Sequence, residues 1–142
     1  MEHYFENYAA EGNVVLKAVA RELGSPEDYG HAFRILQAVF HTVRDRITPQ
    51  ESLHFISELP MALKGLYVHN WKVHEKPKKY ETKNEFLDEV CQEILSTEGG
   101  FESSAEQEVK AVFNVLKKWV SEGEIRHVKG QLTPAIAALI EG

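Results

Sequence analysis

Two short motifs of the same type are the strongest candidates for chemistry in this sequence. Glu51 is followed three residues later by His54, and Glu124 is followed three residues later by His127. Residues three apart share one face of a helix, so each motif would present a carboxylate and an imidazole together. Four-helix carboxylate proteins hold a di-iron or di-manganese centre with motifs of this kind. These four residues are therefore candidate ligands of a di-metal centre.

The di-metal hypothesis has a structural competitor. A centre of this type also needs an inward-facing glutamate from each of two further helices. The apolar stripes around Phe33 and Phe113 supply none. Glu51 and Glu124 also stand three residues after Thr48 and a serine, the pattern of a capping box at a helix start. We therefore expect no cofactor, no metal and no catalytic residue, and keep the four-residue metal site as the alternative.

The elements that must position these motifs belong to an internal repeat. Shifted by 73 positions, residues 38–66 align with residues 111–139 without a gap. The identical positions, in first-copy numbering, are Ala38, Val39, Phe40, Glu51, His54, Leu59, Ala62 and Leu66. Self-similarity of this kind indicates a duplicated unit. We predict one domain spanning the whole chain, with repeats at about 8–67 and 82–140 joined by a linker at 68–81.

Each unit is predicted to consist of helices. Apolar residues from Tyr29 to Ile47 recur at spacings of three and four, which is typical of an amphipathic helix. Ser25-Pro26 and Thr48-Pro49 are typical helix starts. The prediction is an all-α fold, with two pseudo-symmetric repeats of about four helices packed as one bundle. The predicted helices cover 11–23, 26–46, 49–58, 60–67, 83–95, 104–120, 122–130 and 134–140.

Differences between the two copies point to a binding surface. The first copy has Leu53 and Ile56 where the second has Arg126 and Lys129, so the first copy has additional apolar surface. The following linker places aromatic and histidine residues among lysines. We expect any binding surface to include Leu53, Ile56, Tyr67, His69, Trp71 and His74. The alternative is that Trp71 covers Leu53 and Ile56 within the same chain and completes the core.

Composition narrows the class of function. A chain of 142 residues with 43% hydrophobic and 27% charged residues fits one globular domain. A net charge of -6 argues against general nucleic-acid binding. No apolar run is long enough to span a membrane, and the N-terminus lacks signal-peptide features, so a cytoplasmic location is expected. The lone Cys91 is expected to fill core space. We expect a non-enzymatic module that binds a protein, a second copy of the chain or a small ligand.

A longer stretch carries a family resemblance. The segment "RILQAVFHTVRDRITPQESLHFISELPMALKGLYVHNWKVHEKP", followed later by "VFNVLKKWVSEGEIRHVKGQL", resembles a bacterial family filed as domain of unknown function 2267. Members of that family usually carry glycine before the tryptophan, where this chain has Asn70. The resemblance implies an all-helical bacterial protein. It implies no activity.

Overall fold

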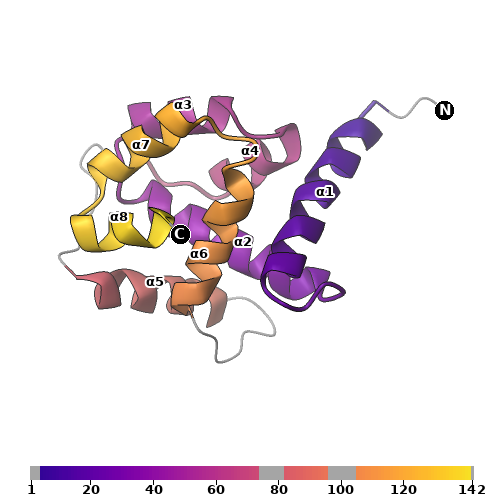
Figure 1. The fold of residues 1–142 in the computed structure, drawn as a ribbon. Coiled ribbons are helices and arrows are strands. Elements are labelled where there is room, and N and C mark those ends of the chain that lie inside the picture. Colours follow the sequence, from indigo (N-terminus) through magenta and orange to yellow (C-terminus); the bar gives the residue numbers. More distant parts are fainter. Residues whose placement is uncertain (1–3, 74–81, 96–104, 142) are drawn as a thin grey trace.

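The protein is all-α, as predicted. The computed structural model describes residues 4–73, 82–95 and 105–141, which form eight helices and no strand (Figure 1). The helices are α1 (Glu6–Glu22), α2 (Tyr29–Arg44), α3 (Pro49–Ser57), α4 (Met61–Val68), α5 (Lys83–Leu95), α6 (Ala105–Leu116), α7 (Glu122–Gln131) and α8 (Pro134–Glu141). None of these described helices is both long enough and apolar enough to cross a membrane.

The main helix packings keep the same pattern when the two predicted units are exchanged. The first predicted unit contains α1 to α4, and the second contains α5 to α8. Across the units, α2 packs on α5, and its counterpart α6 packs on α1. Within the units, α2 packs on α4, and α6 packs on α8. α2 also packs on α6, and α3 packs on α7, so equivalent helices contact each other. In Figure 1, α2 and α6 lie at the centre of the molecule, and α3 and α7 lie together at the top. The duplicated architecture itself stays a prediction. We expect residues 36–66 to superpose on residues 109–139 at a constant offset of 73.

The start of α2 differs from the prediction. α2 begins at Tyr29 because the side chain of Asp28 accepts a hydrogen bond from the backbone N–H of His31, at 3.1 Å. Ser25 belongs instead to a preceding turn, in which the Asp28 N–H donates to the Ser25 carbonyl. Tyr29 and Phe33 are 42% and 45% exposed, so the first turns of the predicted apolar stripe lie outside the core.

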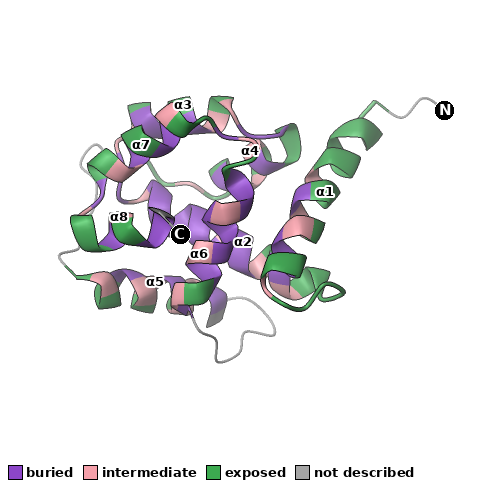
Figure 2. Ribbon diagram, in the orientation of Figure 1, coloured by how far each residue is buried: buried purple, intermediate pink, exposed green. Residues whose placement is uncertain are grey.

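The core lies between the two units and is rich in aromatic rings. Phe40 and Phe113 are each 1% exposed, which confirms that both face inward. Phe40 packs against Phe55 and Tyr67, with ring centroids 6.2 and 5.4 Å apart. Cys91 is half-buried against this core, and burial raises the pKa of its thiol, which fits a packing role. In Figure 2, buried residues (purple) predominate along α2, and exposed residues (green) predominate in the N-terminal part of α1.

One glycine allows two helices to approach closely. A Cβ atom added at Gly12 in α1 would lie 2.7 Å from the Cβ of Ala62 in α4, which is too close for two carbon atoms. We expect Gly12→Ala to lower the free energy of unfolding by about 1–3 kcal/mol because the helices must separate. Gly65→Ala is the matched control, because a Cβ there meets nothing within 4 Å.

The control should stabilise the protein by up to about 1 kcal/mol, since alanine is the better helix former. Urea denaturation measures both variants. Equal stabilisation by the two substitutions would show that α1 and α4 do not meet at Gly12.

Candidate metal centre

The helices that carry the two Glu-x-x-His motifs hold each other's ends. The backbone N–H of Thr48, just before α3, donates to Oε1 of Gln131 at the end of α7, at 2.7 Å. The backbone N–H of Ser121, just before α7, donates to Oε1 of Glu58 at the end of α3, also at 2.7 Å. The two bonds are related by the offset of 73. α3 and α7 therefore run antiparallel, with the start of each at the end of the other.

This exchange corrects the capping-box interpretation. Oγ1 of Thr48 accepts from the Glu51 N–H at 3.1 Å, and Oγ of Ser121 accepts from the Glu124 N–H at 3.2 Å, as predicted. The reciprocal bond, in which the cap backbone N–H donates to the glutamate carboxylate, is absent at both described helix starts because each of these N–H groups donates to the opposite helix. The carboxylates of Glu51 and Glu124 are therefore released from helix capping.

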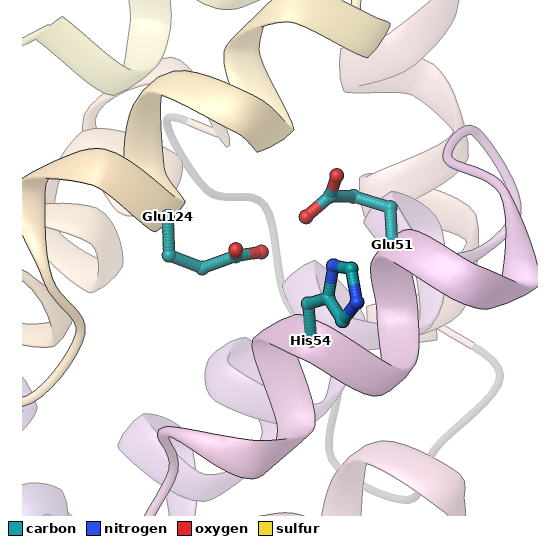
Figure 3. A group of neighbouring side chains, drawn as sticks. All are labelled: Glu51, His54 and Glu124. Atoms are coloured by element: carbon teal, nitrogen blue, oxygen red, sulfur yellow. The ribbon is translucent and has the colours of Figure 1, made fainter.

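Both carboxylates turn toward the junction between the helices. Glu51, His54 and Glu124 each offer a ligand atom, and these atoms all lie within 4.8 Å of one another. Figure 3 shows Glu124 reaching from α7 toward Glu51 and His54 on α3. Glu51 is 9% exposed and Glu124 is 5% exposed, whereas His54 faces solvent. The cluster is thus closed on its carboxylate side and open on its imidazole side.

The cluster is electrostatically incomplete. Oε2 of Glu51 and Oε2 of Glu124 are buried, and neither has a hydrogen-bond partner among the described residues. A buried acceptor without a donor is costly, and two adjacent carboxylates also repel each other. Burial first, then a hydrogen bond that the protonated carboxyl shares with Glu51, and then the charges of Glu51 and Glu58 raise the pKa of Glu124 to about 8. A proton or a cation would relieve both costs.

The raised pKa predicts how stability changes with pH in the metal-free protein. Glu124 keeps its proton in the folded chain up to about pH 8, whereas an unfolded glutamate ionises at about pH 4.3. The folded state therefore binds more protons between these values, and stability falls as the pH rises through that window. With chelator present, we expect a loss on the order of 2 kcal/mol between pH 5 and pH 8.

Glu124→Gln isolates the contribution of this carboxyl. Thermal unfolding of the variant should lose most of that pH dependence and exceed wild-type stability at pH 8. An unchanged pH profile in Glu124→Gln would contradict the shifted pKa.

The structure supports fewer ligands than a di-metal centre needs. The His127 side chain is 69% exposed, and its Nδ1 lies 3.7 Å from Oε1 of Glu124, outside the three-residue group. The expectation of an entirely apolar stripe on the sixth helix was wrong, because Glu108 is buried there. Glu108 pairs with Nε2 of His31 at 3.2 Å and does not join the cluster. The described ligands suit one ion.

The residues predicted to form a binding surface are placed unequally. Tyr67 is fully buried, and its hydroxyl lies 2.7 Å from Oγ of Ser52. Trp71 is half-buried and packs edge-on against the Tyr67 ring at 5.8 Å. Leu53 remains 62% exposed, Ile56 is half-buried, and His69 is exposed. His74 lies outside the described residues.

Sequence reasoning missed the residue that holds this aromatic pair in place. The guanidinium of Arg44, buried at the end of α2, donates to the carbonyls of Tyr67, His69 and Asn70 at 2.6, 2.8 and 3.3 Å. Asn70 has a φ of 55°, so asparagine makes the left-handed turn that glycine makes more readily. The turn directs Trp71 back onto Tyr67. An arginine at the end of an apolar stripe was the available signal.

The fold and the cluster together define an all-α protein in which a carboxylate–histidine group lies where two helix ends meet. No curated protein matched the sequence. The family of uncharacterized conserved proteins termed DUF2267 matches residues 13–139, and the chain therefore belongs to that family. This match agrees with the family resemblance found in the sequence. Membership of the family assigns no activity to the chain.

Proposed function

We propose that this protein binds one divalent transition-metal ion between α3 and α7, through Glu51, His54 and Glu124. Two observations carry the proposal: each of the two carboxylates keeps one buried oxygen without a hydrogen-bond partner, and a carboxylate oxygen of each lies within 4.8 Å of the other and of a nitrogen of His54. A divalent cation would neutralise the two carboxylates and occupy both free oxygens. Since α3 and α7 come from different predicted repeats, the ion would also link the two halves.

The ligand set favours particular metals. Calcium and magnesium prefer oxygen ligands alone, whereas an imidazole with carboxylates suits zinc, manganese or iron. The exposed face of His54 gives an ion a path from solvent and leaves room for water ligands. Zinc and manganese are therefore suitable probes, and zinc should bind more tightly.

Calorimetric titration of the metal-free protein with Zn²⁺ tests the proposal. We expect one equivalent to bind, and Glu51→Gln or His54→Ala to weaken binding at least about 100-fold, because each removes a direct ligand. His127→Ala is the matched control: it removes the same residue type from the equivalent motif and should change affinity by less than about tenfold.

The folded state of each variant is checked by circular dichroism. Unchanged zinc affinity in both Glu51→Gln and His54→Ala would refute the site. An equal loss in His127→Ala would show that the fourth residue is also a ligand, and the three-residue assignment would be wrong.

A second candidate function is a non-enzymatic interaction module, favoured by the exposure of Leu53. Leu53 on α3 is 62% exposed beside the half-buried Ile56, and the Trp71 ring packs edge-on against Tyr67. A second copy of the chain is the partner we propose for this surface. Sedimentation equilibrium should detect a dimer that Leu53→Lys dissociates. A monomer at the highest soluble concentration would contradict this candidate.

A further inference from the structure

A hollow lies among the ends of α6, α7 and α8, outside the metal site. Its volume is about 590 Å³, within the size range of small-molecule pockets. Val120, Ile125 and Ile140 supply its apolar lining, and all three are buried residues of the core. The polar lining consists of Lys117, Glu122, Arg126 and Lys129. An apolar lining beside charged groups suits a ligand with an apolar part and a charged part.

The side chains around the hollow differ from those at the equivalent positions of the first copy. Ile140 corresponds, at the offset of 73, to Tyr67, whose ring fills the first unit and is fully buried. Val128 likewise replaces Phe55, a ring that packs on Tyr67 at 5.7 Å. Two aromatic side chains of the first unit are therefore aliphatic in the second. Ile125, which lines the hollow, stands where the first unit has Ser52, so the lining of the hollow is aliphatic at both positions.

The charge of the lining changes in the same comparison. Arg126 and Lys129 stand where the first unit has Leu53 and Ile56, so the second unit gains two cations beside the hollow. With Lys117 the lining holds three cations against the single carboxylate of Glu122, in a chain whose net charge is -6. Such a local excess of positive charge attracts an anion against the overall field of the protein.

We propose that this pocket binds a small anionic amphiphile, with a phosphate or carboxylate head at Lys117, Arg126 and Lys129 and a short apolar tail against Ile125 and Ile140. The head would form charge-assisted hydrogen bonds with the guanidinium and ammonium groups. The tail would lie beside Ile140, at the position that the Tyr67 ring holds in the first unit. The proposal is independent of the metal site and uses none of its residues.

The test replaces residues that line the pocket by those at the equivalent positions of the first unit. Octyl phosphate is titrated into the full chain and followed by amide NMR shifts. We expect octyl phosphate to bind saturably with one-to-one stoichiometry. Inorganic phosphate lacks the apolar tail and octyl glucoside lacks the charged head, so each should bind at least about tenfold more weakly. Arg126→Leu with Lys129→Ile, the residues found in the first unit, should weaken binding at least about tenfold. Ile140→Tyr should abolish binding by filling the space.

Lys118→Met is the matched control, because it removes one exposed positive charge from the residue adjacent to Lys117 and should leave affinity unchanged. The double substitution lies at the pocket surface, so it remains informative if Ile140→Tyr fails to fold. Equal binding of octyl glucoside, an unchanged affinity in the double variant, or shifts confined to residues away from α6, α7 and α8 would each overturn the proposal.

Discussion

Phe40→Ala is expected to lower the free energy of unfolding by about 3–5 kcal/mol, the usual cost of deleting a buried aromatic ring. Phe40 is 1% exposed and contacts the rings of Phe55 and Tyr67, so its removal opens a cavity where neighbouring rings cannot easily close in. Phe33→Ala is the control on the same helix, since Phe33 is 45% exposed and should cost far less. Urea denaturation measures both.

A cost below about 1 kcal/mol for Phe40→Ala would mean that this ring is not enclosed, which contradicts the packing of α2. Phe113→Ala extends the same experiment to the second unit. A loss comparable to that of Phe40→Ala is expected, because Phe113 is equally buried.

Arg44→Met is expected to cost about 2–4 kcal/mol, because three carbonyl groups lose a charged donor while the side-chain volume is roughly kept. The matched control is Lys117→Met, at the position 73 residues later, because the Lys117 side chain is exposed. That substitution should change stability by less than about 0.5 kcal/mol.

The two variants also differ in a spectroscopic signal. In a Trp119→Phe background, Arg44→Met should shift the fluorescence of Trp71 to longer wavelength, since the turn that holds the indole against Tyr67 loses its anchor. Unshifted emission together with wild-type stability would show that Arg44 does not fix this turn.

Much of the fold was predictable because local signals and tertiary packing agree. Thr48-Pro49 and Ser121 each mark a helix start to the residue, since cap chemistry is encoded within four positions. The start of α2 was not predicted, because Asp28 and Ser25 offer equally good caps and only the turn between them decides. The exposure of Phe33 was likewise missed, since periodicity indicates a helical face but not how far along the helix its partners extend.

The candidate site was predictable in its residues and not in its geometry. The paired motifs identified Glu51, His54 and Glu124, but the capping pattern favoured a structural role for both glutamates. Only the antiparallel contact of α3 with α7 shows that Gln131 and Glu58 take over the capping bonds, because those residues lie far from the caps in sequence. A cap N–H can be bonded by the nearby glutamate or by a residue distant in sequence. A local sequence pattern carries no information about the distant residue.

The most direct measurement is anomalous X-ray scattering at the zinc absorption edge from crystals grown with one equivalent of Zn²⁺. The account predicts a single peak between α3 and α7, about 2.0–2.2 Å from a nitrogen of His54 and from a carboxylate oxygen of each of Glu51 and Glu124. No peak at this junction, or zinc bound only to other histidines while the two carboxylates share a proton, would contradict the proposed metal site.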